Sequence, residues 1–141
     1  MTWTAGDTPP PIRLPLTLRR AVQAVAGTRD YYPFHHDDEF AKANGVQGMF
    51  FNTMFLQAFA GRAVNEWFGF DAFLRKLDVA MVGSNYIDRT LEATGTVTAV
   101  REVEGITLVD GDLTLATDDG VTTRCTFTIQ LPVAVHPGEG A

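Results

Sequence analysis

The stretch Asn52-Thr53-Met54-Phe55-Leu56-Gln57-Ala58-Phe59-Ala60-Gly61-Arg62-Ala63-Val64-Asn65-Glu66-Trp67-Phe68-Gly69 decides the fold of this chain. Apolar residues cover most of the circumference that it would have as a helix, and the clearly polar exceptions are Gln57, Arg62, Asn65 and Glu66. Asn52 is a suitable N-cap for a helix from about Thr53 to Phe68, and Gly69 is a suitable end. Since a helix this apolar cannot face water on all sides, we expect the rest of the chain to enclose it.

Beyond Gly69 the apolar residues recur with a period of two, which is typical of strands with one buried face. One strand is expected around Leu77 to Met81, another from Thr90 to Ala99, and two more on either side of the hairpin signal Asp118-Asp119-Gly120. An interruption, a turn, a β-bulge and a final stop are expected at Gly83-Ser84-Asn85, Glu104-Gly105, Asp110-Gly111 and Pro132. One long helix followed by antiparallel strands, without an internal repeat, predicts a single α+β domain over residues 1–141.

The two ends of the chain carry weaker signals. Residues 1–16 are rich in proline and are expected to run as an extended lead-in over the surface. The next run, Leu16 to Ala26, is compatible with a strand or with a short helix, and its apolar, β-compatible residues favour the strand. Residues 133–141 are expected to form a flexible tail.

Composition excludes several classes of function. The formal net charge is -6 and the basic residues are scattered, which argues against a surface that follows nucleic-acid phosphates. No apolar run approaches the roughly 20 residues of a membrane span, and the first residues lack the order of a signal peptide, so the cytoplasm is expected. Cys125 is the single cysteine and lies in a strand pattern, so we expect a buried hydrophobic residue rather than a nucleophile.

An acid and an imidazole lie five positions apart before the long helix. Pro33 has a fixed φ and no amide hydrogen, so the segment from Asp30 to His35 cannot lie inside a helix and should form an ordered loop. Asp37 can then cap a short helix that Gly45 ends. Backbone constrained on both sides would let Asp30 and His35 hold one water between them and pass a proton near neutral pH.

This loop resembles the signature of the MaoC-like, (R)-specific enoyl-CoA hydratases. The matching residues are Thr28, Asp30, Pro33, His35 and Ala41. Arg29, Tyr32 and Phe34 depart from the signature, because the family usually has Gly, Asn and a small aliphatic residue there. The layout of helix and strands is also that of the family's hotdog fold, in which a curved antiparallel sheet is wrapped around one long central helix.

A second likeness concerns the substrate. Tyr32, Asn52 and Thr53, together with the string Arg62-Ala63-Val64-Asn65-Glu66-Trp67, look similar to the small hydratase subunits of bacterial steroid side-chain degradation. The resemblance implies that water is added to a 2-enoyl-CoA thioester with a bulky or steroid-derived acyl group. It implies no cofactor and no metal beyond the CoA thioester itself, and a second hotdog chain as partner in a homodimer or heteromer.

The resemblance also assigns roles to individual residues. Asp30 is expected as the principal base or proton carrier and His35 as its partner in orienting the water, with the reverse division left open. The first amides of the helix, near Thr53, would donate to the thioester oxygen. Asn52 and Tyr32 are expected to contact the substrate.

Other interpretations stay open. The chain could be a catalytically silent hotdog subunit that shapes a partner's acyl-CoA pocket, or a hotdog thioesterase whose carboxylate activates water against the carbonyl. Singly, Asp30 could cap a loop and His35 could be a histidine satisfied before a helix. The run His35-His36-Asp37-Asp38 does not predict a metal site, because consecutive side chains rarely converge on one ion. His36 should point away from His35, toward a helix start or an interface.

Overall fold

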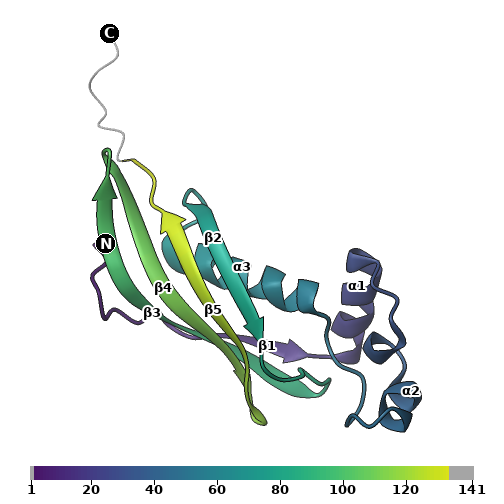
Figure 1. Ribbon diagram of the computed structural model, residues 1–141. Coiled ribbons are helices and arrows are strands. Elements are labelled where there is room, and N and C mark those ends of the chain that lie inside the picture. The colour runs from purple at the N-terminus through teal and green to yellow at the C-terminus, as the bar shows by residue number, and fades with distance from the viewer. Residues whose placement is uncertain (1, 134–141) are drawn as a thin grey trace.

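Five antiparallel strands form one curved sheet, and one long helix crosses its concave side (Figure 1). This structure is a computed structural model that describes residues 2–133. The strand order is β1-β3-β4-β5-β2, so β1 and β2 are the edges. The strands are β1 Ile12–Leu16, β2 Phe73–Met81, β3 Arg89–Val103, β4 Ile106–Thr117 and β5 Gly120–Gln130. The helices are α1 Leu18–Thr28, α2 Asp38–Ala43 and α3 Thr53–Phe68, with a 3-10 turn at Pro33–His35.

The helix α3 has the bounds that the sequence predicts, because local caps fix both ends. The side chain of Asn52 accepts a hydrogen bond from the amide of Phe55 at 2.9 Å, and Gly69 takes a φ of 99° after the last turn. The face toward the sheet is buried and consists of Leu56, Phe59, Ala60, Ala63, Val64, Trp67 and Phe68. Each large apolar side chain on that face contributes about 2 kcal/mol by leaving water.

The opposite face of α3 is open. Met54 on that face is 46% exposed, and Ala58 is also exposed. The expectation that the chain encloses the helix is therefore wrong for residues 2–133, because a single sheet covers one side only. The uncovered face is mixed, since Gln57, Arg62 and Glu66 are exposed on it together with Met54 and Ala58.

The sheet packs closely against the C-terminal half of α3. A Cβ atom at Gly95 in β3 would lie 2.6 Å from Cζ3 of Trp67, so any other residue there would displace the indole. Gly111 in β4 likewise leaves room for the ring of Phe127. The indole nitrogen of Trp67 donates to the carbonyl of Pro10 at 2.8 Å, which ties the N-terminal segment across this end of the helix.

The lead-in predicted for residues 1–16 is only partly extended surface chain. Its last residues form β1, which pairs with β3 from Ile12 to Leu16. Pro15 lies within this strand. A proline cannot donate to a ladder, but β1 is an edge strand and has one side on which no donor is required.

The strand favoured for Leu16 to Ala26 is wrong, because α1 occupies most of that run. The hydroxyl of Thr17 accepts from the amide of Arg20 at 3.2 Å and caps the helix. Ala21 and Val25, one helical turn apart, are its buried residues. The helical spacing of these two buried residues therefore matches the observed structure better than the β-compatible composition does.

The strand registers shift at three places. One shift lies where the change of facing was predicted, but the extra residue is Thr98 in β3, opposite Asp110 and Gly111. The other two were not predicted. One is at Arg75 in β2, and the other is at Thr122 in β5, beside Val121, which is 39% exposed.

The remaining expectations concern Cys125 and membrane spans. Cys125 is buried in β5, as predicted, and burial raises the pKa of its thiol to about 11. The thiol therefore stays protonated near neutral pH and acts as a small apolar side chain. Among residues 2–133, no helix combines the length and apolarity that crossing a membrane requires. The tail predicted for residues 133–141 lies, apart from Val133, outside the described residues.

Candidate active site

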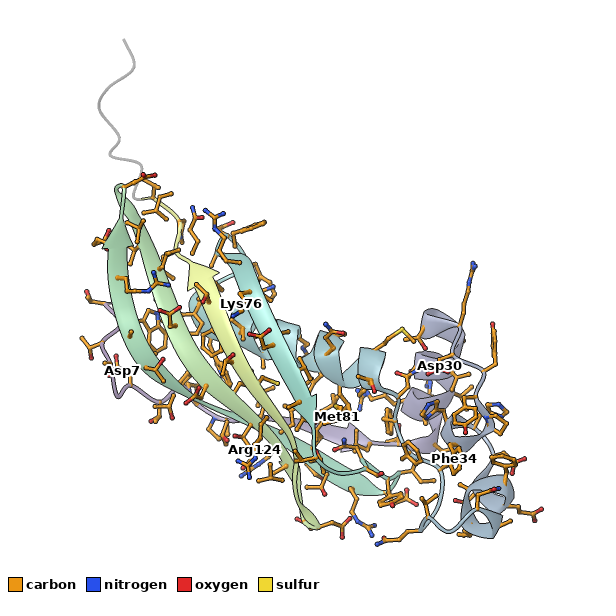
Figure 2. All side chains as sticks on the ribbon, in the orientation of Figure 1. Asp7, Asp30, Phe34, Lys76, Met81 and Arg124 are labelled. Carbon is orange, nitrogen blue, oxygen red and sulfur yellow. The ribbon has the colours of Figure 1, made fainter. Side chains whose placement is uncertain are left out.

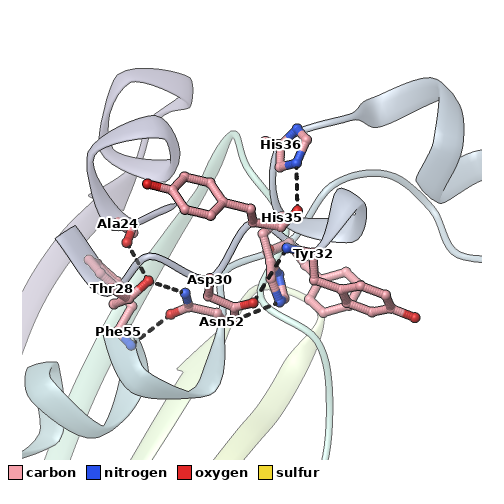
Figure 3. Close-up of polar contacts among 10 residues, drawn as sticks. Ala24, Thr28, Asp30, Tyr32, His35, His36, Asn52 and Phe55 are labelled. Atoms are coloured by element: carbon pink, nitrogen blue, oxygen red, sulfur yellow. Dashed lines mark hydrogen bonds and ion pairs between the residues drawn. The ribbon is translucent and has the colours of Figure 1, made fainter. Parts of the chain in front are cut away.

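The loop after α1 brings Asp30 and His35 face to face. The helix ends at Thr28, and Arg29 turns the chain through the left-handed region with a φ of 56°. Tyr32 is extended, as a residue before proline should be, and the 3-10 turn then places His35 opposite the acid. The Oδ2 atom of Asp30 lies 3.3 Å from Nε2 of His35 (Figure 3). The predicted ordered loop is therefore present, and its two chemical groups meet.

The other ring nitrogen of His35 fixes the tautomer. Nδ1 lies 2.8 Å from the carbonyl oxygen of Phe50. A carbonyl can only accept, so Nδ1 carries a proton, and Nε2 is the nitrogen that faces Asp30. The carboxylate and Nε2 can share a proton directly, or both can bond to a water that lies to one side of them.

The two groups differ in exposure. The His35 side chain is 10% exposed, whereas that of Asp30 is 28% exposed. The second carboxylate oxygen of Asp30 is the acceptor for the amide of Tyr32 at 3.4 Å, a weak bond. The pair thus has an imidazole held on one side by the protein and a carboxylate open to solvent on the other.

The N-terminus of α3 lies beside this pair, as Figure 3 shows. Asn52 is 2% exposed, and both ends of its amide bond within the protein. Its oxygen caps the amide of Phe55, and its nitrogen donates to the hydroxyl of Thr28 at 2.7 Å. The backbone amides of Thr53 and Met54 have no acceptor within residues 2–133, as is usual for a first helical turn. They are the donors that α3 offers to a substrate.

Tyr32 forms the rim of the site. Its side chain is 57% exposed, and its ring packs against Phe34 with the centroids 5.1 Å apart. The ring also lies edge-on to the imidazole of His35, with the two ring centroids 6.1 Å apart. Tyr32 can therefore contact a ligand that enters from solvent.

The run His35-His36-Asp37-Asp38 diverges as expected. His36 is directed toward the carbonyl of Tyr31, 3.0 Å from Nε2, and so points away from His35. Asp37 caps α2 through the amide of Phe40, and Asp38 pairs with Lys42. Within residues 2–133, no group of three or more histidine, cysteine or acidic side chains could hold a metal ion.

The largest hollow among those described lies elsewhere. Its volume is about 500 Å³, and it opens on the outer face of the sheet among outward residues of β2, β4 and β5, such as Asp78, Asp112 and Arg124. Figure 2 places Lys76 and Arg124 on the sheet, and Asp30 and Phe34 among the short helices at the other end. Neither Asp30 nor His35 lines this hollow, so size alone would have indicated the wrong place.

Two contributors to the site were not identified from the sequence. The carbonyl of Phe50 belongs to the backbone, and no side-chain pattern reports a backbone acceptor. The bond from Asn52 to Thr28 joins residues that are 24 positions apart. The only sequence signal for it was a hydroxyl residue two positions before the acid.

The MaoC like domain matches residues 5–118 of this chain. The β subunit of 3-oxo-4,17-pregnadiene-20-carboxyl-CoA hydratase of Mycobacterium tuberculosis is 30% identical over 81 residues, which are 57% of this chain. The match spans 63% of the length of that curated relative.

Solved structures support the fold. A chain of the ChsH1-ChsH2 complex from Mycobacterium tuberculosis has a TM-score of 0.85 at 25% identity, over 94% of this chain and 100% of that one. The (R)-hydratase from A. caviae involved in PHA biosynthesis has a TM-score of 0.84 at 16% identity, over 93% and 98%. The HadBC (3R-hydroxyacyl-ACP dehydratase) complex from Mycobacterium tuberculosis gives 0.75 at 15% identity, over 92% and 98%. The predicted α+β hotdog fold is thereby confirmed.

Proposed function

This chain belongs to the MaoC-like domain family, and we propose that it adds water to a 2-enoyl-CoA thioester, with Asp30 and His35 as the groups that activate the water. The observation that carries the proposal is the contact of 3.3 Å between Asp30 Oδ2 and His35 Nε2 beside the open end of α3. Neither residue alone would be specific. Together, the carboxylate and the imidazole face each other, and the first turn of α3 lies beside them.

The proposed reaction begins with a water held between the carboxylate and Nε2. As the water oxygen bonds to the β-carbon, one proton moves from the water to the pair, and the double-bond electrons shift toward the thioester oxygen. The amides of Thr53 and Met54 donate to that oxygen. The α-carbon then takes one proton from the pair, which returns to its starting state with one water consumed. No cofactor enters these steps.

Within the pair, we assign the principal proton transfer to Asp30. Its carboxylate is the more exposed group and has weak internal bonding, so it can follow the proton from the water to the α-carbon. His35 is held by Phe50 and is better suited to orient the water. The reverse division uses the same atoms, because Nε2 is also a free acceptor.

The proposed substrate carries a bulky, steroid-derived acyl group. The support is the similarity to the β subunit of the Mycobacterium tuberculosis 3-oxo-4,17-pregnadiene-20-carboxyl-CoA hydratase. The exposed ring of Tyr32 is a second support, since an apolar rim suits a large fused-ring acyl group. Asn52 remains a proposed neighbour of the substrate, although the oxygen and the nitrogen of its side-chain amide both form hydrogen bonds within the protein.

We further propose a second hotdog chain as partner. Strand β2 is an edge of the sheet, so the backbone groups on its outer side have no partner strand within residues 2–133. Phe73 at its start is 63% exposed. An open strand edge next to an uncovered helix face is a surface that pairing with a second chain would satisfy. The ChsH1-ChsH2 and HadBC structures are themselves complexes.

These complexes also favour one other candidate function. In a two-chain assembly, this chain could be silent and shape the acyl-CoA pocket of a partner. The two functions differ in which acid the turnover depends on. Asp30→Asn in this chain abolishes turnover in the first case and leaves it intact in the second, when the partner keeps its own acid.

The test is a panel of short-chain and steroid-like 2-enoyl-CoAs, with the protein alone and with any copurifying hotdog chain. Loss of the enoyl absorbance measures hydration, and release of free thiol identifies a thioesterase. Asp30→Asn and His35→Ala should abolish hydration in a folded protein. Asp37→Asn and His36→Ala are matched controls, because they make the same chemical changes on neighbouring side chains that point elsewhere. Full activity in both site variants would rule the proposal out.

A further inference from the structure

Residues 50–52 connect both halves of the proposed catalytic pair. The carbonyl of Phe50 holds Nδ1 of His35, and the amide of the same residue donates to Phe34 at 3.1 Å. The amide of Phe51 donates to the carbonyl of Asn85 at 2.9 Å, which fixes this short segment to the loop before β3. The imidazole therefore takes its place from residues 50–52 rather than from its own loop alone.

Asp30 has no equally strong bond of its own. Its only side-chain contacts within residues 2–133 are the 3.4 Å bond from Tyr32 and the 3.3 Å approach to His35. It follows Thr28 by two positions, with Arg29 in the left-handed region between them. Consecutive Cα atoms are about 3.8 Å apart, so the place of Thr28 limits the places that Asp30 can take.

Thr28 is held from two sides. Its hydroxyl donates to the carbonyl of Ala24 at 2.6 Å, within α1. The same oxygen accepts from the side-chain nitrogen of Asn52 at 2.7 Å. Asn52 in turn caps α3 through Phe55. A short chain of hydrogen bonds thus runs from the last turn of α1 to the first turn of α3 (Figure 3).

We propose that the bond between Thr28 and Asn52 is a positioning link that sets Asp30 at its distance from His35 and from the first amides of α3. Thr28 and Asn52 act in this way through Asp30 and not by contact with the reacting atoms. The inference rests on the proposed hydration, because it concerns the geometry that this reaction needs. It also gives the buried amide of Asn52 a role that requires no contact with substrate.

The test compares three threonine substitutions. Thr28→Val keeps the shape of the side chain and removes the hydroxyl, while Thr28→Ser keeps the hydroxyl. Thr17→Val removes the N-cap at the opposite end of the same helix, where nothing leads to Asp30. It therefore serves as the control for general loss of helix stability.

Thr28→Val should lower kcat about 30-fold with KM within about threefold, since misplacement by about 1 Å can cost a hundredfold. The kcat of Thr28→Ser should stay within about threefold of the wild-type value. Thr17→Val should keep the wild-type kcat even if its Tm falls as far as that of Thr28→Val. If Thr28→Val does not fold, Thr28→Ala tests the same link, because it also removes the hydroxyl that accepts from Asn52. Equal kcat in Thr28→Val and wild type, or equal losses in Thr28→Val and Thr28→Ser, would overturn the link.

Crystal structures of the variants give a readout that does not depend on activity. The separation of Asp30 Oδ2 from His35 Nε2 is 3.3 Å and should lengthen in Thr28→Val but not in Thr17→Val. Lengthening in a protein whose wild type hydrates no enoyl-CoA would refute the function and retain the link. If the separation is unchanged in Thr28→Val and the wild-type protein does hydrate an enoyl-CoA, the link is refuted and the function is retained.

Discussion

The two ends of α3 differ in the residues that surround them. The C-terminal end is apolar and closed: Trp67 fits over Gly95 and bonds to Pro10, and Trp3 packs on Phe68 with the ring centroids 4.6 Å apart. The N-terminal end contains a buried asparagine amide, two backbone donors with no acceptor among residues 2–133 and, beside them, a carboxylate next to an imidazole. One end of the helix is therefore packed core, and the other carries the polar groups of the candidate site.

The closed end is also fastened by the chain before β1. The amide of Gly6 donates to the carbonyl of Val97, and the amide of Val97 donates to the carbonyl of Asp7, both at 2.8 Å. These bonds lie next to the bulge at Thr98, where the ladder with β4 is interrupted. The open end has no such cover, which leaves it accessible to a ligand. The comparison predicts that substitutions at one end change stability and that those at the other change turnover.

The largest effect should follow from the carboxylate. Asp30→Asn should lower turnover about a thousandfold, a typical contribution of a positioned acid-base group. The Tm should stay within a few degrees of wild type, because this side chain is partly exposed and makes only weak bonds. Steady-state hydration and thermal unfolding on the same preparations check both halves. A large fall in Tm would place Asp30 in the scaffold instead.

The closed end should show the opposite pattern. Trp67→Ala should lower the free energy of unfolding by about 3 kcal/mol, because it removes a buried aromatic side chain and leaves a cavity beside Gly95. Turnover per folded molecule should change less than about threefold. Urea unfolding, with activity normalised to the folded fraction, measures this. Loss of turnover in fully folded protein would mean that the two ends are coupled.

A smaller effect, on stability, is expected at Arg29, which joins the end of α1 to the loop of Asp30 and His35. Arg29 has a φ of 56°, a conformation that costs a residue with a Cβ about 1 kcal/mol. Arg29→Gly should therefore raise the free energy of unfolding by up to about 1 kcal/mol, partly offset by the greater freedom of glycine in the unfolded chain. Chemical denaturation checks the sign. A lower stability would show that the arginine side chain makes a contact that outweighs the backbone cost.

The smallest effect should come from the outer face of the sheet, which belongs to neither end. The hydrogen bond from Arg101, supported by one from Thr128, lowers the pKa of Asp110 below its ordinary value near 3.8. A lowered folded-state pKa gives stability that is present above the ordinary value and lost as the pH falls through the folded-state pKa. Asp110→Asn should thus cost less than about 1 kcal/mol at pH 7, and the difference should vanish in acid. Unfolding at pH 7 and pH 3 tests this, and a gap that widens in acid contradicts it.

The sequence predicted those parts of the fold that local signals determine. Asn52 and Gly69 set the ends of α3, Asp37 set the start of α2, and Pro33 with Asp30 and His35 set the loop. The bulge at Thr122 could not be predicted, because it depends on how β5 pairs with β4 near the hairpin. The helix α1 was mistaken for a strand because short apolar runs satisfy both periods.

For the candidate site, the sequence identified the two side chains that meet and not the groups that hold them. Asp30 and His35 are recognised by their side chains, so their spacing was informative. The acceptor for Nδ1 is a main-chain carbonyl, and the partner of Asn52 is a threonine brought near only by folding. Long-range hydrogen bonds leave little trace in a single sequence.

The main-chain carbonyl at position 50 has a consequence for divergence within the family. Replacing Phe50 by another residue changes the ring that packs on His35 but leaves the oxygen that fixes the tautomer. The lining next to the imidazole can therefore change size with the residue at position 50, while the oxygen that holds Nδ1 stays in place.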